Sequence, residues 1–355
     1  MGPMSQTRHK PRKARPHDRA HSGIPTVSAA LIVKNEAEII TRCLDSVRPL
    51  VDEIVVYDTG STDDTVTICR AAGARVFEGY WDDDFSRARN AALAECRGDW
   101  VLSIDADETV AGKRGDLRSA LSNAQSAKVG LLIVEQTILE PGGHTGYDVP
   151  QQRLFRRRGA AWTGRVHEQP TVLAGLRGAQ LDASVMKLTH YGYSVSKDQL
   201  AAKSERNLQL ALADVSDRVE DDEEYPLAKA LLDLGRSLMG VKRWADAFTA
   251  FSDVRDLADK TGWLWAEATS CLARIAVRTG NHLAAIDLAD ELSQVHPQLT
   301  GYAHYLATEA LMGAGQVEAA RELISTVDEV VDATGRRYDP ELVHAYKVRI
   351  GAVPA

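Results

Sequence analysis

Cysteine is scarce in this chain of 355 residues: there are four, far apart, with no CxxC pair. That spacing argues against both a zinc site and a disulfide framework. No uncharged apolar run approaches the roughly 18 residues that a membrane-spanning helix needs, and no apolar segment near the N-terminus indicates a secretory signal. These absences predict a globular protein with no membrane span, in a reducing, cytoplasmic setting.

Beyond the first residues, acidic side chains outnumber basic ones. Residues 1–23 hold six Lys or Arg against one acid, although the net charge of the chain is −8, so the remainder carries about −13. An acidic body does not favour nucleic-acid binding, which needs a basic face. We expect residues 1–25 to be a disordered basic tail whose first three residues are a cloning remnant. Contact of this tail with RNA or anionic lipid is the alternative to a simply solvated tail.

Residues 26–195 alternate apolar runs with amphipathic stretches, the pattern of an open α/β sheet. Ligands of such sheets bind at the carboxyl ends of the strands. The segment Ser61–Asp64 resembles a capping box that would start the second helix. We expect strands at 27–33, 54–57, 75–77, 100–104 and 130–134, helices near 36–48, 62–72, 85–97 and 114–124, and short strands and loops over 136–195.

From about residue 197 the pattern changes to helix after helix, which we take as a second domain over residues 196–355. Three segments share one spacing, each with a small residue five positions after its start: Lys242 to Ala247, Gly280 to Ala285, and Gly315 to Ala320. The offsets of these segments suit a tetratricopeptide repeat, whose period is about 34 residues. A generic helical bundle is the alternative. In both cases this half is a scaffold or a partner-binding surface.

The sharpest chemical signal is the pair Asp105 and Asp107, which follows an apolar strand as Asp-Ala-Asp-Glu. Two carboxylates at a strand end can hold Mn²⁺ or Mg²⁺, which prefer oxygen ligands and are commonly shared with substrate phosphates. A metal there would neutralise the charge of a nucleoside diphosphate leaving group. Acidic pairs also decorate surfaces, but the preceding buried strand favours metal and nucleotide-sugar binding.

Polar residues also end the first two strands. Asp58 is followed by Gly60, which permits close approach of a ligand to the backbone, and the carboxylate could accept a hydrogen bond from a base. A helix N-cap is the structural alternative for Asp58, but Ser61 would cover the cap and leave it free. From the first strand, Val33, Asn35 and Glu36 would meet the nucleoside.

Arg87 and Arg89 open the helix that precedes the Asp105–Asp107 strand. Because they are two positions apart, they point to different sides of a helix, so at most one faces the nucleotide. The other is expected to be solvated or paired with Asp82, Asp83 or Asp84.

Four motifs in this order together resemble family 2 glycosyltransferases of the GT-A fold over residues 26–195. They are Ile32–Glu36, Val56–Asp63, Phe85–Asn90 and Asp105–Glu108. With the helical region, the whole chain resembles the family 2 enzymes that carry C-terminal tetratricopeptide repeats, a group that includes the S-glycosyltransferases of glycocin biosynthesis. The resemblance implies a GT-A domain, a Rossmann-like mixed sheet, followed by an all-α repeat domain.

The resemblance also implies roles for single residues. Asp58 would contact uracil, and Asp105 with Ala106 would contact the ribose or the water shell of the metal. Asp107 would ligate the metal directly, and His190 is the candidate for a further metal ligand, with an ordinary loop histidine as the alternative. Glu168 is the candidate for the catalytic base and His167 the second choice, with structural roles as the alternative. The acceptor-side Glu-Asp pair usual in the family is not evident here.

The expected function is therefore inverting, metal-dependent transfer of a sugar from a UDP-sugar, with the repeats recruiting a peptide or protein acceptor. A small-molecule, lipid or glycan acceptor is the first alternative, with the repeats serving to form a homodimer. A repeat adaptor whose sugar-nucleotide domain has lost catalysis is the second. The sequence leaves the sugar and the acceptor atom open.

Overall fold

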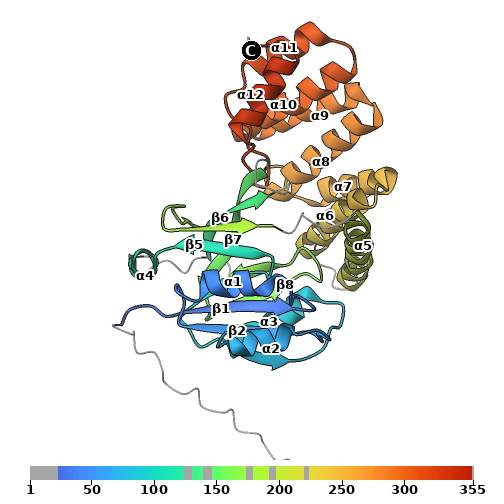
Figure 1. Cartoon of the computed structure of the whole chain (residues 1–355). Helices are drawn as coiled ribbons and strands as arrows, with labels where there is room; N and C mark the ends of the chain where they lie inside the picture. Colours follow the sequence, from blue (N-terminus) through green and yellow to red (C-terminus); the bar gives the residue numbers. More distant parts are fainter. Residues whose placement is uncertain are drawn as a thin grey trace, which may run out of the picture.

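The computed structural model describes residues 23–123, 130–138, 146–172, 179–191, 197–219 and 224–353. It divides into a sheet domain and a helical region that rises from one side of it (Figure 1). The sheet domain contains the strands β1 (Val27–Val33), β2 (Glu53–Asp58), β3 (Arg75–Glu78), β4 (Trp100–Ser103), β5 (Glu108–Gly112), β6 (Gly130–Ile138), β7 (Gly146–Arg156), β8 (Ala160–Thr163), β9 (Gln169–Val172), β10 (Ala179–Gln180) and β11 (Met186–His190). Its helices are α1 (Ile40–Val47), α2 (Thr65–Ala71), α3 (Phe85–Glu95) and α4 (Arg114–Asn123).

The main sheet is mixed, in the order β3-β2-β1-β4-β7-β6-β11-β5, with β10 beside β6. The first four strands of that order run parallel, whereas β7 is antiparallel to both β4 and β6, and β5 is antiparallel to β11. Only residues 104–107 join β4 to β5, yet three strands separate them in the sheet. The sheet must therefore curl until its far edge returns to the end of β4, which places residues 105–107 where it closes.

Apolar side chains cover both faces of the sheet. One face packs against α1, α2 and α4, through residues such as Leu44, Cys69 and Leu117. The other face packs against α3 and β8, through residues that include Leu93 and Trp162. The expected strands and helices are confirmed, apart from the second helix. That helix begins at Thr65, and its first turn is held by Asp63, which accepts from the Thr65 backbone N–H at 3.0 Å, so the capping box predicted at Ser61 is wrong.

The helical region is a series of antiparallel helix pairs that confirms the repeat predicted from the sequence. Its helices are α5 (Lys197–Val219), α6 (Glu224–Gly240), α7 (Trp244–Leu257), α8 (Trp263–Thr279), α9 (His282–Val295), the 3-10 helix η2 (Pro297–Leu299), α10 (Thr300–Gly313), α11 (Val317–Ser325) and α12 (Pro340–Arg349). Three positions that the repeat makes equivalent share a left-handed backbone: Lys242, Gly280 and Gly315 have φ of 63°, 80° and 75°. The small residue of each unit is fully buried.

The helical region contacts the sheet domain at two places. Near its start, Leu210 and Ala211 of α5 are buried with Val166 against Trp81 and Phe85. Near its end, the segment between α11 and α12 meets the start of β7, where the Arg337 N–H donates to the Asp148 carbonyl at 2.8 Å. In Figure 1 the helices arch between these two contacts. None of the described helices combines the length and apolarity needed to cross a bilayer.

Candidate active site

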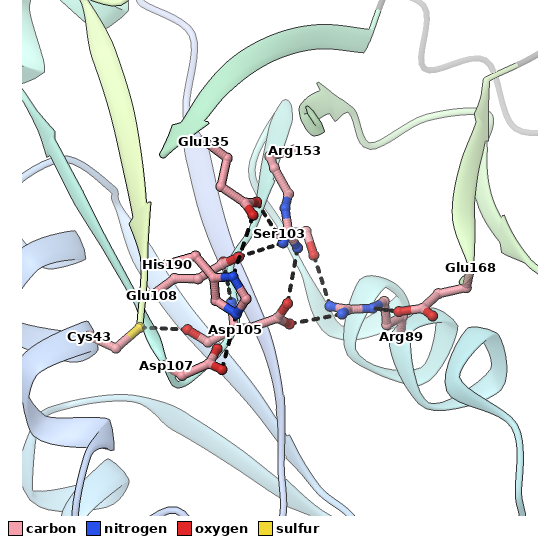
Figure 2. Close-up of polar contacts among 10 residues, drawn as sticks. All are labelled: Cys43, Arg89, Ser103, Asp105, Asp107, Glu108, Glu135, Arg153, Glu168 and His190. Atoms are coloured by element: carbon pink, nitrogen blue, oxygen red, sulfur yellow. Dashed lines mark hydrogen bonds and ion pairs between the residues drawn. The ribbon is translucent and has the colours of Figure 1, made fainter. Parts of the chain in front are cut away.

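Three strand ends and one bulge bring the charged side chains of the site together (Figure 2). Asp105 and Asp107 follow β4, and His190 ends β11, where it is paired in register with Glu108 of β5. The Tyr191 N–H donates to the Asp107 carbonyl at 3.0 Å, which fixes the two chain segments side by side. Sheet closure thus joins groups that lie 83 positions apart in the sequence.

Arg153 enters the site because β7 carries one extra residue there. Leu131 pairs with Leu154 and Leu132 pairs with Gln152, so Arg153 is the bulged residue between them. A bulge breaks the regular alternation of a strand and redirects a side chain. The Arg153 guanidinium donates to Asp105 at 3.2 Å, to Glu108 at 2.5 Å and to Glu135 at 3.1 Å.

Arg89 is the second buried guanidinium, and it enters from α3 on the other side of Asp105 (Figure 2). It donates to Asp105 at 2.8 Å, to the Ser103 hydroxyl at 3.1 Å and to Glu168 at 2.5 Å. Arg87 instead pairs with Asp82 and lies over the Tyr80 ring, with half of its side chain exposed. The pairing with Asp82 that was expected for one of the two arginines is thus made by Arg87, whereas Arg89 is turned toward Asp105 and Glu168. That Arg89 meets the nucleotide stays a prediction.

The two arginines set the ionisation of the buried carboxylates. Burial opposes the ionisation of Asp105, but Arg89 and Arg153 outweigh it and hold the pKa of this carboxyl well below its usual range. Burial raises the pKa of Glu108 well above its usual value, with Asp105 and Glu135 adding to the effect and Arg153 opposing it. The two arginines therefore stabilise the ionised form of Asp105, whereas burial opposes the ionisation of its neighbour Glu108.

Asp107 and His190, the two side chains predicted to ligate a metal, lie against each other where the sheet closes. The His190 Nε2 lies 3.2 Å from the Asp107 carboxylate, and its Nδ1 lies 3.7 Å from Glu135. Burial alone would lower the pKa of His190, but the hydrogen bond and charge of Asp107 raise it above its ordinary value. In metal sites, the ring of a ligating histidine is usually oriented by a carboxylate near its other nitrogen, which is the place of Glu135 here.

Asp105 differs from the sequence expectation that it also ligates the metal. Both of its oxygens accept from guanidinium groups, one from Arg89 and the other from Arg153. Among the described residues, no group of three or more His, Cys, Asp and Glu side chains is arranged to hold a metal ion. The donor set that remains, one carboxylate and one imidazole, suits Mn²⁺ or Mg²⁺ whose other ligands come from substrate phosphates and water.

Hydrogen bonds join the loop after β1 to the loop after β2. Asn35, with a left-handed φ of 57°, accepts from the Thr62 N–H at 2.8 Å, and its own N–H donates to the Ser61 hydroxyl at 2.9 Å. Val33 is buried in this strand end, where its carbonyl accepts from the Thr59 N–H, and Ala106 is buried in the turn between the two aspartates.

Asp58 is not free, contrary to the prediction. Its carboxylate is 3% exposed and accepts from the backbone N–H groups of Gly60 and Ser61, at 3.0 and 2.9 Å, and from the Ser61 hydroxyl. Asp58 therefore shapes the loop that follows β2, in which Gly60 has a φ of 108°.

Glu36 lies in the acidic part of the site. Burial raises the pKa of Glu36 to about 7, and the charges of Asp107 and Asp105 add to the effect. Its carboxyl is therefore divided between the neutral and the ionised form at neutral pH.

The two candidates for the base have different surroundings. Glu168 is nearly buried, with 11% of its side chain exposed, and Arg89 binds its Oε1. His167 has a left-handed φ of 52°, and its Nε2 lies 3.5 Å from the Ser237 hydroxyl of α6. Surrounding protein, with Arg236 and Lys229, lowers the pKa of His167 to about 4. Because the His167 side chain is exposed to solvent, the effect is weaker than full burial would give, but its direction favours the neutral ring.

Sequence reasoning missed Glu108, Glu135 and the hub role of Arg153. One usable signal was present, because Glu135 follows directly after the apolar run Leu131–Val134. Trp162, beside the site, is 6% exposed, packs against Phe155 and lies under the Arg89 guanidinium. It belongs to the core.

Residues 28–162 match the family model "Glycosyl transferase family 2". A TPR repeat-containing protein of Synechococcus elongatus is 34% identical over 61% of this chain and 55% of its own length. The SPbeta prophage-derived glycosyltransferase SunS of Bacillus subtilis is 32% identical over 53% of this chain and 45% of its own length. The chain thus spans about half the length of the curated relatives it matches.

Among solved structures, glucosyl-3-phosphoglycerate synthase from Mycobacterium tuberculosis, crystallised with Mg²⁺ and UDP, is 30% identical over 32% of this chain and 43% of that chain. Its TM-score of 0.25 is too low for the likeness to bear on fold or ligands. The family match rests on the β1–β8 segment, which holds Asp105, Asp107 and Arg153. Residues 28–162 of the sheet domain are therefore similar to family 2 glycosyltransferases, and a helical repeat region follows that domain.

Proposed function

We propose that this protein transfers a sugar from a UDP-sugar to a peptide or protein side chain, with inversion at the anomeric carbon. One observation carries the proposal: the Asp107–His190 pair stands beside an arginine-fixed Asp105 at the point where the sheet closes. The match to family 2 covers the strands that build this site, apart from β11. The repeats offer a surface for a polypeptide acceptor, as helical repeat arrays commonly do.

Asp107 and His190 would hold a divalent cation, which when bound supplies neutralising charge for the donor diphosphate. Arg89 and Arg153 keep Asp105 ionised and fixed in one position. The loops after β1 and β2, tied together through Asn35, would hold the nucleoside. Preorganised groups of this kind need no rearrangement as charge develops in the transition state.

The transfer forms one bond and breaks another at the anomeric carbon. An acceptor oxygen, sulfur or nitrogen bonds to C1, while the bond from C1 to the β-phosphate oxygen breaks and its electron pair leaves with the diphosphate. The acceptor proton passes to the Glu168 carboxylate, whose Oε1 is held by Arg89. For a thiol acceptor the base is needed less, because the thiol pKa is about 8.5.

The test is isothermal titration of the protein with UDP, with and without Mn²⁺. We expect binding that depends on Mn²⁺ and is lost in Asp107→Ala, because that change removes a metal-binding carboxylate and no core atom. Asp287→Asn, an exposed acid on α9, is the matched control and should bind as the wild type does. Metal-independent binding, or equal binding by Asp107→Ala, would remove the assigned metal site.

The acceptor class is tested by incubating the protein and Mn²⁺ with UDP-glucose, UDP-galactose or UDP-N-acetylglucosamine and a peptide library, followed by intact-mass analysis. A peptide that gains one hexose or N-acetylhexosamine supports the proposal. Donor turnover that modifies glycans or small molecules and no peptide would point to the other acceptor class.

A further inference from the structure

The site described so far has too little positive charge for a nucleoside diphosphate. Arg89 and Arg153 are shared among four carboxylates, those of Asp105, Glu108, Glu135 and Glu168. Even with Glu108 neutral, these carboxylates exceed the two guanidinium groups in charge. Glu36 and Asp107 add further negative charge beside them. A diphosphate entering this crevice needs cations besides the two arginines, and one divalent ion offsets only part of its charge.

Other arginines of the sheet domain near the crevice are turned to different partners. Arg87 pairs with Asp82, and Arg156 lies over the ring of Trp100. Arg165 forms an ion pair with Asp217 at the domain contact, at 2.7 Å. The helical region brings a further cation to this part of the molecule, because Arg206 lies over the Phe85 ring at the start of α3.

The first helix of that region, α5, is placed against the crevice by apolar packing. Leu210 is 4% exposed and packs with Val166 near Trp81 and Phe85. Lys203, Arg206 and Leu210 stand at positions i, i+3 and i+7 of one helix, and therefore share a face. The burial of Leu210 against the sheet domain thus directs Lys203 and Arg206 toward the same side.

The contacts of the two cations agree with that placement. The Arg206 guanidinium lies over the Phe85 ring, with its carbon 5.2 Å from the ring centre, where α3 begins. Arg206 also interacts electrostatically with Glu168. The charge of Lys203 makes a small contribution that opposes the rise in the pKa of Glu36 and adds to the fall in the pKa of His167, which agrees with the face that Lys203 shares with Leu210.

We propose that Lys203 and Arg206 of α5 bind the diphosphate of the nucleotide-sugar donor, so that the helical region completes the donor site. The inference rests on the proposed function, because it takes the ligand to be a nucleoside diphosphate sugar. Lys203 is exposed and is a flexible point charge, suited to following a phosphate, whereas Arg206 is held over Phe85. Charge-assisted contacts of this kind strengthen as the leaving diphosphate gains charge.

The inference makes the two regions one catalytic unit, in which the repeats do more than recruit an acceptor. Substitution of Lys203 or Arg206 should therefore change the affinity for the donor more than the affinity for the acceptor. It should also act through the phosphates, and leave the base and ribose contacts unaffected.

The experiment compares UDP with uridine. UDP affinity is measured by titration in Mn²⁺, and uridine affinity by displacement of UDP, for the wild type, Lys203→Gln, Lys203→Arg and Arg206→Gln. We expect Lys203→Gln to weaken UDP by about tenfold, the usual scale for one charge-assisted contact, and to leave uridine unchanged. Lys203→Arg should recover most of the loss. Lys113→Gln, an exposed lysine at the far end of β5, is the matched control and should bind both ligands as the wild type does.

The melting temperature of Arg206→Gln is measured alongside its UDP affinity, because Arg206 also packs over the Phe85 ring and its loss could lower stability. UDP affinity that stays unchanged in both Lys203→Gln and Arg206→Gln overturns the inference and leaves the proposed function standing. Equal losses for UDP and uridine overturn it as well, since that result indicates a disturbed nucleoside site. A higher acceptor KM at unchanged UDP affinity would assign the two cations to the acceptor instead. A wild-type protein that binds no UDP overturns the proposed function, and the inference with it.

Discussion

Arg153 shows how one buried charge organises this site. Its side chain is 14% exposed and serves three carboxylates, so removal would leave buried negative charge without a partner. Lysine could not replace it, because a guanidinium offers a planar set of five donors whereas an ammonium is a single point. The side chain reaches this position only because β7 bulges at Arg153.

Glu168→Gln tests the assigned base without removing the partner of Arg89. The amide keeps an oxygen that can accept from Arg89 Nε, but it cannot take up a proton. We expect the rate of transfer to a hydroxyl acceptor to fall by about 10²-fold or more, with UDP affinity unchanged. The measurement is single-turnover transfer alongside UDP titration. Unchanged transfer would move the base to another group.

Glu36→Gln tests whether the charges of Asp105 and Asp107 oppose the ionisation of Glu36 in the metal-free protein. The pKa of Glu36 is raised to about 7, so the folded protein favours the neutral carboxyl. The stability this gives is fully present below the unfolded pKa of about 4.5 and is lost as pH rises through about 7. The glutamine variant cannot ionise, so its melting temperature should exceed that of the wild type more at pH 8 than at pH 5.

That comparison is made in chelator, by thermal melts at both pH values. Glu38→Gln is the control, since Glu38 is exposed two positions along the same segment. A melting-temperature difference that stays constant with pH, or that grows toward pH 5, would contradict the assigned repulsion around Glu36.

At the scale of elements, the repeat imposes one backbone conformation before three of its helices. Gly280 and Gly315 meet this need without strain, whereas Lys242 adopts the same left-handed region with a side chain. The helices of a pair also approach closely, since a Cβ on Gly235 would lie 2.6 Å from the Phe251 ring. Glycine thus serves two separate purposes in these repeats.

Gly280→Ala isolates the conformational cost. A Cβ there would meet no heavy atom within 4 Å, so the expected loss of about 1 kcal/mol comes from the left-handed backbone alone. The measurement is a shift in the urea midpoint. Lys242→Ala, at the equivalent position, already has a Cβ in the wild type and should change the midpoint little. Equal shifts in the two variants would show that the repeats do not share this constraint.

At the scale of the whole molecule, a small apolar contact sets how the helical region meets the active site. Leu210→Ala should lower stability by about 2–4 kcal/mol and also weaken UDP binding, because α5 carries Lys203 and Arg206. Leu212→Ala is the control, since Leu212 is 42% exposed on the same helix. The assays are thermal melts and UDP titration. A loss of stability with unchanged UDP affinity would show that donor binding does not depend on the position of α5.

The sequence by itself determined the alternation of strands and helices in the sheet domain, although not β5, together with the change to helical repeats near residue 197 and the placement of Asp105 and Asp107 at a strand end. Local periodicity, turn residues and strand-end polarity carry that information, because each depends on neighbours within a few positions. The same local reasoning separated Arg89 from Arg87, since helical geometry alone places them on different sides.

Only the tertiary structure decided which charges neutralise one another. Sheet closure brings His190 to Asp107, the bulge turns Arg153 onto Asp105, and α5 places Arg206 over the Phe85 ring. The assignment of Asp58 as a free acceptor failed for a related reason: its hydrogen bonds depend on how the loop folds back on it. Contacts between distant segments depend on strand order and register, and residue identity at one position carries no record of them.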